Sequence, residues 1–214
     1  MQGECGVWPL WTAMEELDDF ADITEERSCV FEERLAAAEE LRQTGNQFFA
    51  TGDLVNAEDC YHRALFHANF DPLQYNFELM DQHREGLDRI RHPLCLNLAA
   101  VRIAYGYFQS AVTLCKAVLK EDANNAKALF RRAKAYKGLK QHDLAKEDIT
   151  KAFKLMPSDT KVYELYREIK AICAREEAKV AKFWKGRLVK EPKPFSMTSF
   201  LSIRNPFNLF YWIL

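Results

Sequence analysis

The 214-residue sequence has few of the residues that make tight turns, with only 8 glycines and 7 prolines. Sandwiches and barrels built of β-strands need many such turns, so this scarcity argues against both classes. The sequence shows no uninterrupted apolar run of about 18 residues, as an ordinary transmembrane helix requires, and no basic start of a secretory signal. Its formal net charge is only −1, which gives no sign of a nucleic-acid partner.

The chain also lacks the common signatures of catalysis and metal binding. It contains no glycine-rich phosphate loop, no H-E-x-x-H and no nucleophile elbow, and we expect its many carboxylates on helix surfaces. The six cysteines form no C-x-x-C pair and show no zinc spacing to a histidine. We therefore expect neither an enzyme nor a bound metal or cofactor. We interpret the dispersed cysteines as reduced, mostly buried thiols of a cytoplasmic protein.

The composition is that of a globular protein, with 48% hydrophobic and 29% charged residues. The charge, however, is divided unevenly along the chain. Residues 1–30 hold eight acidic side chains and one basic side chain, whereas residues 124–190 hold eighteen basic and eight acidic ones. A basic second half favours an acidic partner, although a well-solvated helical surface rich in lysine explains the same balance.

Three segments, beginning near residues 38, 92 and 126, align on small residues. The second and third are offset by 34 residues, and the first and second by 34 plus an insertion of 20. Small residues at this spacing predict repeated helix hairpins whose helices cross closely, and each hairpin needs its neighbours to bury its apolar face. The aligned small residues are Gly45, Ala99 and Ala133; Ala57, Ala111 and Ala145; and Ala64, Val118 and Ala152.

Turn and cap residues separate the predicted helices. Three glycines fall in or near the expected turns, where glycine tolerates a left-handed backbone. These glycines are Gly52, Gly106 and Gly138. Pro157 ends the third repeat, and Ser158 or Asp159 can cap the next helix. Apolar residues at three- and four-residue spacing then predict one long amphipathic helix.

This pattern resembles the tetratricopeptide repeat (TPR) family over about 70% of the chain, and in particular the TPR portion of large immunophilins and the small tetratricopeptide repeat protein nine family. The resemblance implies an all-α TPR superhelix of three helix-turn-helix repeats plus a long C-terminal capping helix. Arg102 and Ala123 depart from the usual repeat pattern. The implied organisation is an acidic segment 1–34, a TPR domain 35–190 and an apolar tail 191–214. Within the domain the repeats cover about 38–69, 92–125 and 126–159, the insertion about 70–91 and the capping helix 160–188.

Five polar residues of the expected inner helices resemble the dicarboxylate clamp of chaperone-binding TPR domains, whose pattern is Lys, Asn, Asn, Lys, Arg. Arg42 takes the first lysine position, and its planar guanidinium is the one departure. The other four positions are matched by Asn46, Asn97, Lys127 and Arg131. Residues four apart share a helix face, as do Lys127 and Arg131. The resemblance implies binding to the acidic C-terminal Glu-Glu-Val-Asp tail of cytosolic heat-shock chaperones of the seventy- and ninety-kilodalton classes.

We therefore expect a protein–protein interaction adaptor, a co-chaperone that binds chaperone C-terminal peptides and presents another surface to an unknown client. The alternative is a TPR scaffold for a different protein complex, without chaperone binding. The continuous apolar run of the tail is too short to span a bilayer, but its aromatic residues suit interfacial membrane contact. A docked tail or a non-native end from alternative splicing explains the run equally well. The acidic N-terminal segment is interpreted as a disordered tail, a partner motif, a helix laid on the TPR body or an occupant of the basic groove.

Overall fold

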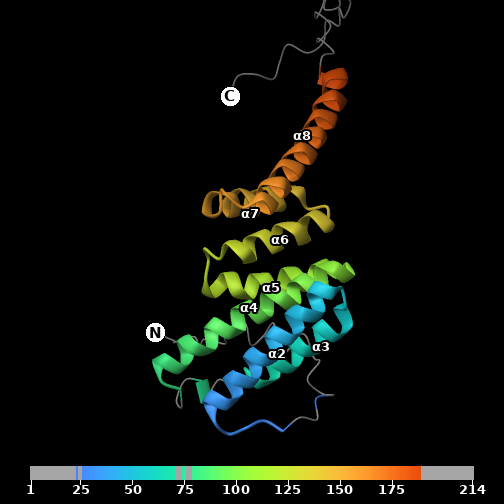
Figure 1. Ribbon diagram of the computed structural model, residues 1–214. Coiled ribbons are helices and arrows are strands. Elements are labelled where there is room, and N and C mark those ends of the chain that lie inside the picture. Colours follow the sequence, from blue (N-terminus) through green and yellow to red (C-terminus); the bar gives the residue numbers. More distant parts are fainter. Residues whose placement is uncertain (1–22, 24–25, 71–73, 76–78, 189–214) are drawn as a thin grey trace, which may run out of the picture. The chain divides into compact units, whose positions relative to one another are not determined.

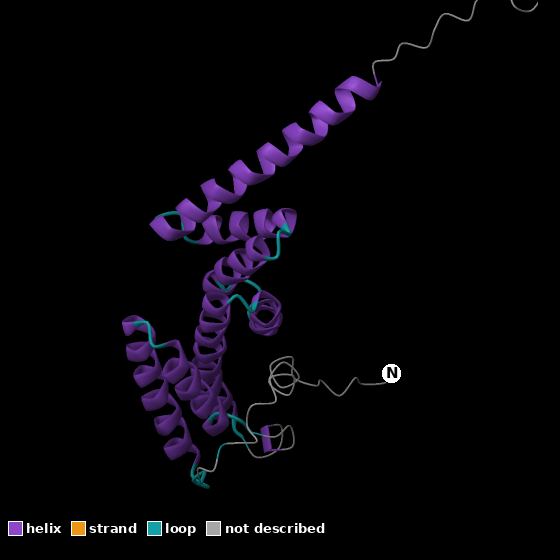
Figure 2. Cartoon of the chain, turned by 90° about the vertical axis from the view of Figure 1, so that its right-hand side faces the viewer, coloured by secondary structure: helices purple, strands orange, loops and turns teal. Residues whose placement is uncertain are grey.

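A computed structural model of the chain describes residues 23, 26–70, 74, 75 and 79–188. Among these residues the structure contains helices and loops and no strand (Figure 2), which confirms the predicted all-α class. The helices are α2 (Phe31–Thr51), α3 (Leu54–His67), α4 (Asp81–Tyr105), α5 (Phe108–Glu121), α6 (Ala126–Gly138), α7 (His142–Leu155) and α8 (Thr160–Leu188). No described helix combines the length and the hydropathy that a membrane span requires.

Two parts of the sequence predictions lie outside the described residues. These are most of the acidic N-terminal segment, of which residues 23 and 26–34 are described, and the whole apolar tail. The insertion is described at residues 70, 74, 75 and 79–91, and from Asp81 onward it forms the first turns of α4. The chain divides into two compact units, Met1–Cys173 and Ala174–Leu214, and the described part of the second is the end of α8.

The first unit contains three helix pairs, α2 with α3, α4 with α5 and α6 with α7. Short connections join the two helices of each pair, as is usual for antiparallel neighbours. The pairs stack in chain order, with α3 against α4 and α5 against α6 (Figure 1). Helix α4 also contacts both α2 and α6, so the first helices of the three pairs lie next to one another. This arrangement places α2, α4 and α6 along one surface.

The small residues of the repeat lie at the helix crossings, as the spacing predicts. All nine aligned positions are buried, and each of the eight that carry a Cβ is 0% exposed. At Gly45 a Cβ would lie 2.7 Å from Cε1 of Tyr61, a ring that is itself 1% exposed. A side chain at this position would force α2 and α3 apart, because real Cβ contacts are not that short. The first repeat therefore needs glycine where the others accept alanine.

The turn glycines fill two different roles. Gly52 and Gly106 follow α2 and α4 with φ of 85°, the left-handed conformation expected of a glycine cap. Gly138 instead ends α6, and the left-handed residue of the following turn is Lys140, with φ of 60°. A Cβ on Gly138 would lie 2.5 Å from the Phe108 ring. The position was predicted correctly, but the reason for glycine is close packing of α6 on α5.

The cap predicted before the long helix is present at Asp159. Its Oδ1 accepts a hydrogen bond from the backbone N–H of Lys161 at 2.8 Å, and α8 begins one residue after Asp159. Within the first unit α8 packs on α7 through the rings of Phe153 and Tyr166, which stack with centroids 5.0 Å apart. Ile169 is fully buried. The start of α8 thus covers the apolar face of the last repeat.

One carboxylate contradicts the expectation that acidic residues lie on helix surfaces. Asp148 on α7 is 4% exposed. It is held by the guanidinium of Arg132 on α6, whose Nε and Nη2 donate to its two oxygens at 2.6 and 2.7 Å. A buried carboxylate requires such a partner. This bidentate pair joins the two helices of the third repeat.

Candidate peptide-binding groove

A groove of about 680 Å³ lies along the surface formed by α2, α4 and α6. The five residues predicted from the resemblance all line it. Arg42 and Asn46 come from α2, Asn97 from α4, and Lys127 and Arg131 from α6. The structure therefore brings together side chains that are up to 89 residues apart in the sequence. The remaining lining residues are His92, Pro93, Leu96, Asp122, Asn124, Asn125, Ala126 and Met156.

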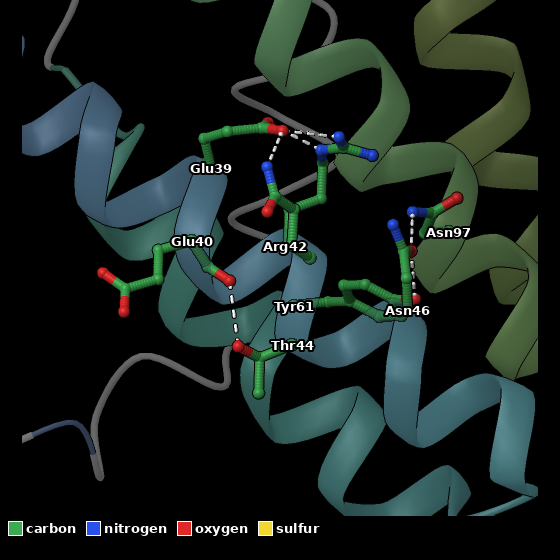
Figure 3. Close-up of polar contacts among 8 residues, drawn as sticks. Glu39, Glu40, Arg42, Thr44, Asn46, Tyr61 and Asn97 are labelled. Carbon is green, nitrogen blue, oxygen red and sulfur yellow. Dashed lines mark hydrogen bonds and ion pairs between the residues drawn. The ribbon is translucent and has the colours of Figure 1, made fainter.

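The two asparagines belong to a chain of hydrogen bonds across the helices (Figure 3). The Tyr61 hydroxyl and Nδ2 of Asn97 both donate to Oδ1 of Asn46 at 2.8 Å. Arg131 in turn donates to Oδ1 of Asn97 from Nη2 at 3.3 Å and from Nη1 at 3.4 Å. These bonds use the oxygens of both amides. No acceptor for Nδ2 of Asn46 occurs among the described residues, so this donor remains for a ligand.

Arg131 carries a positive charge that the described part of the protein does not neutralise. Its hydrogen bonds go to the neutral amide of Asn97, and no described carboxylate forms an ion pair with it. Loss of hydration by burial lowers the pKa of the Arg131 guanidinium. A partly dehydrated cation without a counter-ion gains more from a carboxylate than a fully hydrated one does. The site thus favours an anionic ligand at this point.

A second positive charge lies at the start of α6. Lys127 is exposed in the first turn of that helix, and no described acidic group lies within ion-pair distance of it. Asn125 caps the helix by accepting from the N–H of Ala128 at 3.1 Å. The positive end of the helix dipole therefore lies beside Lys127, and both favour an anion.

The third cation, Arg42, is already paired. Its Nη2 and Nε donate to Oε1 and Oε2 of Glu39 at 2.6 and 2.7 Å (Figure 3). The hydrogen bond from Arg42 holds the pKa of the Glu39 carboxyl below its usual value, and the same bond raises the pKa of Arg42. Gln43 also donates to this carboxylate at 2.9 Å. A ligand carboxylate at Arg42 must compete with Glu39.

Sequence reasoning missed Glu39, which pairs with a groove residue, and two residues that line the groove, His92 and Met156. Glu39 lies three residues before Arg42 on one helix, and that spacing is a recognised signal for an ion pair. His92 gave no such signal, because its neighbour is on another helix: Nε2 of His92 lies 2.7 Å from Oε2 of Glu121. Met156 likewise reaches the groove from the end of a different repeat.

Three stacked helix hairpins with small residues at their crossings, a further helix and a groove along the first helices define a TPR domain. The described residues thus have the fold of a TPR domain, and the sequence is similar to those of FKBP-type immunophilins. No family model matches its sequence. Peptidyl-prolyl cis-trans isomerase FKBP42 of Arabidopsis thaliana is 34% identical over 147 residues, which make up 69% of this chain and 39% of that protein. The chain covers between 27% and 39% of the length of the first curated relatives.

Solved structures support the same class. The C-terminal TPR-containing domain of an FK506-binding protein from Plasmodium falciparum aligns with a TM-score of 0.59 and 26% identity, covering 70% of this chain and 95% of that one. The myosin chaperone UNC-45 from C. elegans, solved in complex with an Hsp90 peptide, aligns with a TM-score of 0.52 and 28% identity. That match covers 64% of this chain and 14% of UNC-45.

Proposed function

We propose that this protein is a co-chaperone adaptor that binds the acidic C-terminal peptide of cytosolic heat-shock chaperones of the seventy- and ninety-kilodalton classes. The peptide-binding residues are Arg42, Asn46, Asn97, Lys127 and Arg131. The observation that carries the proposal is one groove that holds two cations without a described carboxylate partner, beside two oriented amides. The Hsp90 peptide bound to UNC-45 supports this choice of ligand.

A C-terminal aspartate fits this groove because it presents two carboxylates a few ångströms apart. Arg131 and Lys127 supply charge-assisted hydrogen bonds, and Nδ2 of Asn46 adds a neutral donor. Each charged hydrogen bond contributes about 1.5–3 kcal/mol before costs. Desolvation and ordering of the peptide offset much of this gain. We expect micromolar affinity, roughly −8 kcal/mol.

The same proposal extends to the organisation of the chain. Residues 35–190 form the TPR domain and act by binding, without catalysis. The five described cysteines are free thiols, which supports a cytoplasmic location, where thiols stay reduced. The client binds elsewhere on the protein.

The first test is calorimetric titration of the full chain with a Met-Glu-Glu-Val-Asp peptide, beside the same peptide amidated at its C-terminus. Amidation removes one of the two carboxylates and should abolish measurable binding. Replacement of Lys127 by alanine should weaken binding of the free-acid peptide about 10- to 100-fold, because one charge-assisted contact is lost. Lys134→Ala is the matched control, since Lys134 is exposed on the same helix but does not line the groove.

Equal binding of the amidated and free peptides would contradict the proposal, because the C-terminal carboxylate would then have no role. Equal losses in Lys127→Ala and Lys134→Ala would show a general charge effect. In either case the protein would be a TPR scaffold for another partner.

The Glu39→Gln variant should bind the peptide about two- to fivefold more tightly than the wild type. The substitution removes the carboxylate that occupies Arg42, and a partly exposed ion pair of this kind is worth about 0.5–1 kcal/mol. Glu40→Gln is the matched control, because it changes the charge equally and the Glu40 side chain points away from Arg42 (Figure 3). The measurement is the ratio of the two dissociation constants. Equal affinities would mean that Arg42 binds the peptide without releasing Glu39, or does not bind it.

A further inference from the structure

A second cluster of polar side chains lies between α4 and α5. Asp88 and His92 are four residues apart and share a face of α4, and Glu121 is the last residue of α5. One ligand-type atom from each, a carboxylate oxygen or an imidazole nitrogen, lies within 4.8 Å of the other two. The geometry points to a binding site for one divalent transition-metal ion, with Asp88, His92 and Glu121 as its ligands.

Two carboxylate oxygens of this cluster are shielded from solvent and have no partner. Oδ1 of Asp88 and Oε1 of Glu121 are both buried and accept no hydrogen bond among the described residues. Buried acceptors are normally satisfied, and an orphaned pair calls for an explanation. These two oxygens are therefore available as ligands for a cation.

The neighbouring groups do not supply the missing hydrogen-bond partners. The charge of Arg91, a buried residue, acts on Asp88, but Nε of Arg91 is itself without a hydrogen-bond partner. Nε2 of His92 lies 2.7 Å from Oε2 of Glu121 and leaves Oε1 of Glu121 without a partner among the described residues. A divalent cation would coordinate the carboxylates of Asp88 and Glu121 at the same time.

The donor set indicates which ions fit. An imidazole nitrogen with two carboxylates suits zinc and its first-row neighbours, whereas magnesium and calcium prefer oxygen ligands alone. Zinc bonds of about 2.0–2.2 Å place tetrahedral ligands roughly 3.4 Å apart. The three ligand atoms lie within 4.8 Å of one another, so side-chain rotations would bring them to this spacing, and the ion would take the place of the direct His92–Glu121 contact. Three protein ligands leave a fourth position open.

The test is a zinc titration of the metal-free full chain by calorimetry, with cobalt absorption to report the ligand type. We expect one equivalent of zinc to bind, and binding to weaken at least about tenfold in His92→Gln and in Asp88→Asn. His83→Gln is the matched control, because His83 lies on the same helix but stacks on Phe31. Excess magnesium should not compete, and the cobalt spectrum should lack a thiolate charge-transfer band.

Three results would overturn the site. They are the absence of saturable zinc binding, equal affinity of His92→Gln and wild type, and a thiolate band that assigns the ion to cysteines. Helical circular dichroism of each variant separates loss of ligand from loss of fold. The titration uses no peptide, so its outcome is independent of the proposed chaperone binding.

Discussion

Replacement of Arg131 by methionine is expected to weaken peptide binding at least about tenfold while leaving the fold intact. The guanidinium is partly dehydrated, and among the described residues its one acceptor is the Asn97 oxygen, at 3.3 and 3.4 Å. Its charge is therefore poorly compensated in the free protein and well placed for a ligand carboxylate. Loss of one charge-assisted contact corresponds to about 1.5–3 kcal/mol of binding free energy. Methionine keeps most of the side-chain volume and removes the buried charge, so the free energy of unfolding should stay equal or rise.

Both quantities are measured on the same sample, the dissociation constant by calorimetry and the free energy of unfolding by urea denaturation. Lys134→Ala again serves as the control for a general change of charge. Wild-type affinity in Arg131→Met would show that this guanidinium does not contact the peptide. A clear loss of stability would show that Arg131 is part of the core and not of the site.

Much of the fold could be predicted because small residues repeat at the helix crossings. One aligned set is 0% exposed at every position because the helices cross closely there, namely Ala57, Ala111 and Ala145. The packing partner of each position was harder to predict. The position of Gly138 at the end of a repeat helix suggests a turn glycine. Glycine is needed there, however, because the ring of Phe108, thirty residues earlier, packs against it. The periodicity of apolar residues predicts which face of a helix is buried. It does not predict which side chain of another helix packs against that face.

The candidate groove residues were predictable for a related reason. Lys127 and Arg131 are four apart, and the stacking of equivalent hairpins brings equivalent helix faces together. Spacing alone did not predict which of the charged side chains already have a partner in the folded protein. Glu39 neutralises Arg42 within one helix, whereas the cluster of Asp88, His92 and Glu121 forms only when α4 packs on α5. Contacts between residues on separate helices depend on rotamers that the sequence does not specify.

Two neighbouring arginines of α6 illustrate this difference. Arg131 faces the groove, and Arg132 faces α7, where it pairs with Asp148. Consecutive helix positions point about 100° apart, so they meet different surroundings. Asp148 is also an acidic residue inside a helix pair, where sequence reasoning expected none. Identical side chains thus serve binding at one position and stability at the next.

Replacement of Arg132 by methionine is accordingly expected to have the opposite effect to Arg131→Met, lowering stability and sparing the peptide site. Asp148 is 4% exposed, and removal of its partner leaves a buried carboxylate without a counter-ion. Breaking a buried pair costs about 3–5 kcal/mol, and we expect the lower end because Arg132 retains 19% side-chain exposure. For a chain of this size, a loss of about 3 kcal/mol lowers Tm by roughly 6–12 °C.

The measurement is thermal unfolding by circular dichroism, with peptide affinity determined well below the transition. Affinity should remain within about twofold of wild type, because Arg132 does not line the groove. The double variant Arg132→Met with Asp148→Leu should recover most of the lost stability, since a well-packed apolar pair can replace a buried ion pair. A double-mutant cycle then isolates the coupling between the two side chains. Additive losses in the cycle would mean that Arg132 stabilises α6 by packing, and that Asp148 is buried at a cost the pair does not offset.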